Sequence, residues 1–140
     1  DMVAVRPGQS VLTVCENGFG KRTDIEEYRL TRRGGQGVIN IRTTERNGQV
    51  VALKSVRDDD ELMIITANGI TLRIGLEAIR LIGRATQGVR LIRVDEGDKV
   101  VAVAKIAPEN VAVEAPRAQE ETPPAAEPSD GDAPLDPPTE

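Results

Sequence analysis

The 140 residues are 39% hydrophobic but include one Phe, one Tyr and no Trp, so any core must be built from aliphatic side chains. The absence of His and the single Cys15 exclude an intrachain disulfide, a His/Cys metal cluster and His-assisted nucleophilic catalysis. The net charge of −5 is uneven: residues 1–106 carry 17 Lys and Arg against 14 Asp and Glu, whereas residues 107–140 carry 1 against 9. With no apolar run long enough for a signal peptide or a membrane span, we expect a cytoplasmic protein without membrane contact.

The first predicted element is a short apolar run. Residues 1–5 (DMVAV) are similar to residues 49–53 (QVVAL) and 99–103 (KVVAV), each of which follows a turn-forming stretch. Because the two later copies are predicted to be the last strands of repeated units, residues 1–6 are expected to be the end of a preceding unit.

Residues 7–57 form the first predicted unit, which contains short β-branched runs separated by turn residues. Strands are expected at 11–16 and 19–23, joined by Asn17-Gly18, a strong hairpin signal. A less regular connection over 25–30 follows. A second hairpin is predicted from strands 38–43 and 49–54, with its turn at Asn47-Gly48. The apolar setting of Cys15 in the first strand predicts a buried thiol.

Residues 58–106 repeat this pattern at an offset of 51, which places Asn17-Gly18 on Asn68-Gly69 and Gln36-Gly37-Val38 on Gln87-Gly88-Val89. Strands are expected at 62–67, 70–74, 89–94 and 99–105, with a connection over 76–82. Two units of four antiparallel strands predict an all-β propeller or β-pinwheel array. Residues 107–140, with 8 of the 9 Pro and many acidic residues, are expected to form a disordered tail.

Basic residues gather beside glycines in three stretches, residues 20–23, 29–37 and 83–88. Arginine donates planar, multidentate hydrogen bonds to phosphate, and glycine lets the backbone approach closely, so such loops suit a nucleic-acid backbone. The alternative is an ordinary solvated turn. Further arginines at 42, 46, 73, 90 and 93 add charge, although alternate strand residues face opposite sides. The candidate DNA contacts are Lys21, Arg22, Arg32, Arg33, Gly34, Gly35, Gly37 and Arg84.

Other chemistry is not indicated. Residues 34–37 lack the Gly-Lys-Ser/Thr of a phosphate-binding loop and precede a predicted strand rather than a helix. The acidic run 58–61 lies between predicted strands and is interpreted as a solvated loop rather than a cation site. We therefore expect no catalytic residues, metal or cofactor in this chain.

Four motifs together resemble the closing blades of the DNA gyrase A family. They are Asn17-Gly18-Phe19-Gly20-Lys21-Arg22-Thr23 with Glu27-Tyr28, the Arg/Gly loop 29–37, Thr44-Glu45-Arg46-Asn47-Gly48, and residues 82–89. The family's signature heptad lies in its first blade, and residues 31–37 are a relative of it in which Thr31 replaces Gln and Gln36 replaces Lys. The resemblance therefore implies DNA contact for Arg32 and Arg33, without the essential role of that heptad.

The resemblance implies a β-pinwheel that wraps double-stranded DNA, with the two units here as its fifth and sixth blades. The parent enzyme, an ATP-dependent type II DNA topoisomerase, introduces negative supercoils. Its ATP and Mg sites belong to other domains or to gyrase B, and its partners are the remainder of gyrase A and the gyrase B protein near the nucleoid. The C-terminal domain of topoisomerase IV, which shares the blade architecture, and a protein-interaction propeller with a partner-recruiting tail remain as alternatives.

Overall fold

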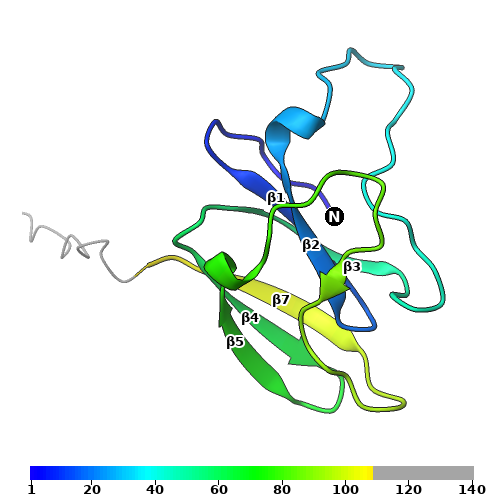
Figure 1. The fold of residues 1–140 in the computed structure, drawn as a ribbon, viewed down its shortest axis with the longest axis vertical. Helices are drawn as coiled ribbons and strands as arrows, with labels where there is room; N and C mark the ends of the chain where they lie inside the picture. Colours follow the sequence, from blue (N-terminus) through cyan, green and yellow to red (C-terminus); the bar gives the residue numbers. More distant parts are fainter. Residues whose placement is uncertain (109–140) are drawn as a thin grey trace, which may run out of the picture.

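The protein folds into two small antiparallel sheets, as a computed structural model that describes residues 1–108 shows (Figure 1). Regular structure in this part of the chain consists of strands and two short 3₁₀ turns. The all-β prediction is confirmed. The expected disordered tail lies, from residue 109 onward, outside the described residues.

The first sheet has the order β3-β1-β2-β6. Its central strands are β1 (Ser10–Cys15) and β2 (Phe19–Asp24), and β3 (Val50–Val56) pairs with the other edge of β1. The predicted turn joins β1 to β2, with the Gly18 amide donating to the Cys15 carbonyl at 3.2 Å and Gly18 at φ +81°. Only Gly18 of the Asn-Gly pair takes the left-handed conformation, which glycine adopts at little cost.

The second sheet repeats three of these strands, in the order β5-β4-β7. Strands β4 (Glu61–Thr66) and β5 (Thr71–Gly75) correspond to β1 and β2, and β7 (Val100–Ile106) corresponds to β3. The predicted connections 25–30 and 76–82 each begin with a 3₁₀ turn, η1 (Ile25–Glu27) and η2 (Leu76–Ala78). The internal repeat is thus a structural repeat.

The second predicted hairpin of each unit is wrong. Residues 38–43 form no strand, and the single bridge there joins Ile41 to Thr86 of the second unit. Strand β3 pairs with β1 and β7 with β4, so both occupy sheet edges next to the first strand of their own unit. The Asn47-Gly48 turn forms, with Gly48 donating to the Thr44 carbonyl at 2.8 Å, but it leads from an irregular segment into β3. Residues 1–6 likewise form no strand.

The fourth strand of the first sheet comes from the second unit. Strand β6 (Val89–Arg90) pairs with β2, where Arg90 opposes Phe19 and Val89 opposes Gly20. We call residues 79–94 the second crossover segment and their repeat equivalents, residues 28–43, the first crossover segment. The first part of the first crossover segment extends away from both sheets (Figure 1), whereas Asn40 returns to contact Thr13 of β1. Among the described residues, β5 has no strand on the edge that corresponds to the β6 side of β2.

The hydrophobic core draws on both sheets and contains aliphatic side chains only. Leu12, Val14 and Val56 come from the first sheet, and Leu62 and Ile64 from the second. Leu76, Ile79 and Ile92 of the η2 region and second crossover segment complete the cluster with Ala52, Val100 and Val103. Cys15 is fully buried in β1, so the predicted buried thiol is confirmed.

Candidate nucleic-acid interface

The first crossover segment carries the Arg/Gly loop, residues 29–37, entirely at the surface. Gly34 has φ +73°, and the Gly35 amide donates to the Arg32 carbonyl at 3.2 Å, which places a tight turn at the centre of the loop. Arg29 closes the loop, since its Nη2 atom donates to the Gln36 carbonyl at 2.8 Å. These bonds give the loop a defined shape without using the Arg32 or Arg33 side chains.

Arg32 and Arg33 are exposed, and no carboxylate of residues 1–108 lies within 4.0 Å of either guanidinium. Space is open around Gly34 and Gly37, where an added Cβ would meet nothing within 4 Å, whereas at Gly35 it would lie 3.1 Å from the Arg32 carbonyl oxygen. The predicted residues of this loop are therefore brought together on one accessible projection. Two unpaired guanidiniums beside exposed backbone can contact a phosphate without reading bases.

Lys21, a predicted DNA contact, is not accessible to a ligand in this structure. Its side chain is fully buried, and its Nζ atom donates to the carbonyls of Asn40 at 2.6 Å and Gly83 at 2.8 Å. Burial lowers the pKa of Lys21, and the charge of Arg84 lowers it further, while Glu27 acts in the opposite direction. The ammonium group therefore joins the two crossover segments and does not face a phosphate.

Arg22, another predicted DNA contact, is also buried and already paired with a carboxylate. Its side chain is 8% exposed and forms an ion pair with Asp58 at 2.7 Å, while its Nε atom is buried without a partner among the described residues. Arg84 is half-buried, and its Nη1 atom donates to the Ile39 carbonyl at 3.3 Å. The predicted contacts therefore divide into two groups: Lys21, Arg22 and Arg84 lie at the junction between the repeats, and the residues of the Arg/Gly loop are exposed.

Polar groups around Lys21 complete this junction. Asn40 accepts a hydrogen bond from the Tyr28 hydroxyl and donates to the Thr13 hydroxyl at 2.8 Å. Burial raises the pKa of Tyr28, partly offset by a hydrogen bond with Thr23 and the charge of Arg84. Tyr28 is thus half-buried within this network, whereas its repeat equivalent, Ile79, lies in the hydrophobic core.

Phe19, which is 4% exposed at the start of β2, is the centre of an arrangement that was not predicted from the sequence. The guanidinium carbon of Arg46 lies 4.7 Å from the centre of the ring, and that of Arg90 lies 5.3 Å from it. Both arginines are exposed. The only signal in the sequence was that Phe19 is the single Phe of the chain. Residues 46 and 90 meet only because β6 of the second repeat pairs with β2 of the first, which we call the strand exchange.

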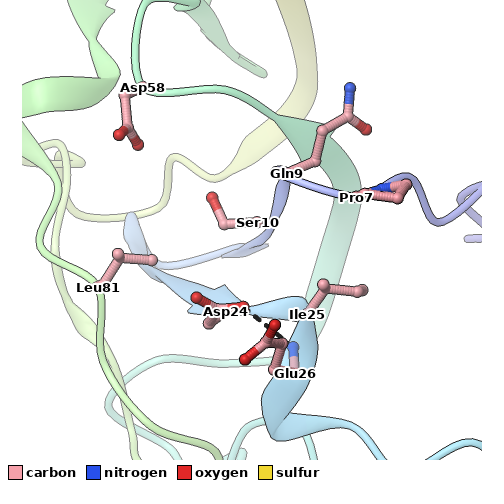
Figure 2. Close-up of a pocket in the computed structure, with 9 residues that line it drawn as sticks. Pro7, Gln9, Ser10, Asp24, Ile25, Glu26, Asp58 and Leu81 are labelled. Carbon is pink, nitrogen blue, oxygen red and sulfur yellow. Dashed lines mark hydrogen bonds between the residues drawn. The ribbon is translucent and has the colours of Figure 1, made fainter.

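A separate pocket, between the start of β1 and η1, has the wrong charge for a nucleic acid. It has a volume of about 260 Å³, and Asp24, Glu26 and Asp58 lie on its wall with Ser10 and Leu81 (Figure 2). The Glu26 amide donates to Asp24 at 3.0 Å, so this carboxylate caps η1. Carboxylates repel phosphate, and this pocket is excluded as part of the interface.

Comparison with known proteins agrees with the repeat architecture. The sequence profile of the family described as "DNA gyrase C-terminal domain, beta-propeller" matches residues 9–57 and 60–107, one match for each repeat. The chain belongs to this family. No helix within residues 1–108 is long and apolar enough to cross a membrane.

Curated relatives are gyrase A proteins. The chain is 50% identical over 97 residues to the DNA gyrase A protein of Rickettsia bellii (strain RML369-C), covering 69% of this chain and 11% of that protein. It is 46% identical over 110 residues to the DNA gyrase A protein of Chlamydia trachomatis serovar D, covering 79% of this chain and 13% of that protein. The chain thus spans a small fraction of the length of these relatives.

Solved structures show the same fold. "Structure of DNA gyrase A C-terminal domain" matches with a TM-score of 0.68 and 27% identity, over 73% of this chain and 35% of that chain. "Crystal structure of the C-terminal domain of DNA topoisomerase IV" matches with a TM-score of 0.67 and 20% identity, over 74% of this chain and 32% of that chain, which shows the fold alone. The higher sequence identity lies on the gyrase side.

Proposed function

We propose that this segment binds double-stranded DNA through the phosphate backbone and helps to wrap the duplex as part of a DNA gyrase A protein. The observation that carries the proposal is the exposed Arg/Gly loop, whose Arg32 and Arg33 have no carboxylate partner among the described residues. Family membership supports the assignment, since the relatives are gyrase A proteins.

In this proposal the two repeats are the fifth and sixth blades of a longer array, and wrapping contributes to the negative supercoiling of the parent enzyme. ATP and Mg are used elsewhere in that enzyme, and the remainder of gyrase A, the gyrase B protein and nucleoid DNA in the cytoplasm are the partners. The chain contributes contacts and curvature rather than reacting groups. A duplex held through its backbone is bound with little direct readout of its bases.

Salt dependence of DNA binding tests the proposal. Titration of a fluorescent duplex of about 30 base pairs with the full-length chain should show an affinity that falls steeply with salt, with a log–log slope of about −0.9 per neutralised phosphate. The charge reversal Arg32→Glu with Arg33→Glu should weaken binding strongly. The matched reversal Arg6→Glu with Arg57→Glu should weaken it less, since these exposed arginines lie outside the Arg/Gly loop. A salt-independent affinity would contradict DNA binding by this chain.

A second candidate function, protein docking, is favoured by one observation on the same loop. Leu30 is fully exposed, and Ile39 is 60% exposed. Exposed aliphatic residues beside arginines are common at protein interfaces. If Leu30→Ser abolished assembly with the remainder of gyrase A while DNA affinity stayed unchanged, the loop would serve docking rather than DNA contact.

A further inference from the structure

The Phe19 ring orders two arginines that come from different repeats. Arg46 lies on the turn that precedes β3, whereas Arg90 lies on β6, which the second repeat contributes to the first sheet. Both Cζ atoms lie within the range of about 6 Å in which a guanidinium is attracted to a ring face, at 4.7 and 5.3 Å from the centre. Because both distances end at the same point, the two guanidinium carbons lie no more than about 10 Å apart.

The backbone that carries each arginine is also fixed. The Asn17 side chain donates to the carbonyls of Glu45 at 3.0 Å and Arg46 at 3.3 Å. Asn47, which is fully buried, donates to the carbonyls of Arg42 at 2.8 Å and Gln87 at 3.0 Å, and so ties the turn to the second crossover segment. Arg90 is held by the pairing of β6 with β2. The two side chains are therefore placed in advance of any ligand.

The charge of this pair is unmatched among the described residues. No carboxylate of residues 1–108 lies within 4.0 Å of Arg46 or Arg90, whereas Arg22 and Arg73 each have one. Two like charges held near one ring repel each other, and an anion placed between them offsets that repulsion. The arrangement is thus complementary to a negatively charged group.

The surface next to Arg90 offers room for such a group. A hollow of about 390 Å³ is lined by Asn17, Arg90, Ile92, Arg93, Val94 and Asp95. Arg93 adds a further basic side chain, and Asp95 is the one acidic residue on its wall. The hollow therefore extends the basic surface beyond the two stacked arginines.

We propose that Arg46 and Arg90, stacked on Phe19, form a phosphate clamp that grips the DNA backbone at the junction of the two repeats. This inference rests on the proposed function and names a contact for it outside the Arg/Gly loop. Phosphates along one strand rise by about 3.4 Å per nucleotide, so two guanidiniums within about 10 Å of each other can hold two phosphates of the same strand. The clamp exists only when β6 lies on β2, which links assembly of the array to DNA binding.

The test compares salt slopes of DNA binding for four forms of the full-length chain, with thermal melting to verify that each is folded. Arg46→Gln with Arg90→Gln should reduce the slope by about 1.8 and weaken binding at low salt on the order of tenfold, because two phosphate contacts are lost. Arg46→Lys with Arg90→Lys should keep the slope and weaken binding less, since charge remains but planar stacking is lost. The control Arg6→Gln with Arg57→Gln should leave the slope unchanged.

Each contrary result has a distinct meaning. An unchanged slope in the Arg46→Gln and Arg90→Gln form, with a steep slope for the unmodified chain, overturns the clamp and leaves the proposed function standing. An equal loss in the Arg6→Gln and Arg57→Gln control also overturns the clamp, because net charge alone would then explain the effect. A flat response of the unmodified chain overturns the proposed function itself.

Discussion

Lys21 shows how a basic residue that the sequence suggests as a DNA contact can instead stabilise the fold. Its ammonium donates to one carbonyl of each crossover segment, at the junction of the repeats. The more distant acceptor, Gly83, is 62 residues further along the chain. A charge-assisted hydrogen bond to a backbone carbonyl is among the stronger polar interactions, and losing the donor leaves the buried acceptor unsatisfied. Lys21 therefore stabilises the surface that carries the exposed arginines.

Lys21→Met should lower the free energy of unfolding by about 2 kcal/mol, because two part-buried hydrogen bonds from a charged donor are lost. Chemical denaturation measures this change. Lys54→Met is the control and should change stability by about 0.5 kcal/mol or less, since the Lys54 ammonium is part-exposed and 3.8 Å from Asp1. The salt slope of DNA binding should be the same for Lys21→Met and the unmodified chain. Unchanged stability with a reduced slope would instead make Lys21 a phosphate contact.

The buried Cys15 thiol should make the folded state less stable at alkaline pH. Burial raises the pKa of the Cys15 thiol above its ordinary value of 9.0, and Glu16 raises it further. Since the folded state holds the proton more tightly, the stability due to the thiol is fully present below pH 9.0 and is lost as pH rises toward the folded pKa. The difference in unfolding free energy between the unmodified chain and Cys15→Ala should therefore shrink above this pH. A constant difference from neutral to alkaline pH would contradict the assignment.

At the scale of the elements, the strand exchange depends on glycines where backbones meet. Gly88 has φ +77°, and a Cβ there would lie 2.6 Å from the Gly20 carbonyl oxygen. Its repeat equivalent, Gly37, lies in the first crossover segment, where an added Cβ would meet nothing within 4 Å. Equivalent positions in the sequence thus have opposite steric surroundings.

Gly88→Ala should destabilise the chain by about 2 kcal/mol or more, because it combines a left-handed backbone with a clash against β2. Gly37→Ala, the matched control, should be close to neutral. Thermal or chemical unfolding of the two variants gives the comparison. Equal effects at the two positions would show that the second crossover segment does not lie against β2 in solution.

The strands and turns next to Asn-Gly pairs could be predicted because their signals are local. Alternating aliphatic residues and a glycine at a left-handed position identified β1, β2, β4 and β5 within about one residue of their bounds. The partner of residues 89–94 could not be predicted, because β6 pairs with β2 about 70 residues earlier and local periodicity does not encode pairing over that separation.

The candidate site, too, could be predicted from the sequence only where the signals are local. The exposed turn at Arg32 and Arg33 follows from glycine content and charge alone. The burial of Lys21 depends on residues 40 and 83, and the clamp at Phe19 depends on residues 46 and 90. Both are products of the strand exchange, so an error in strand pairing became an error in the contact residues.

At the scale of the whole molecule, charge is divided between a folded body and the segment beyond it. Residues 108–140 carry 1 basic and 9 acidic residues. We expect this segment to compete with DNA for the basic surface, so removal of residues 108–140 should tighten DNA binding at low salt. Replacement of its acidic side chains by the corresponding amides, with the length kept, should have the same effect. Equal affinities of the three forms would show that the acidic segment does not compete.

The pairing of β6 with β2 also sets an order of events during synthesis. When the ribosome has completed β3, the first sheet still lacks the strand that will cover Phe19 and Gly20. That strand is about 35 residues further along the chain, and its arrival requires a long loop to close. The nascent first repeat therefore carries an open sheet edge until most of the second repeat has left the exit tunnel. The first repeat therefore completes its sheet only through the second.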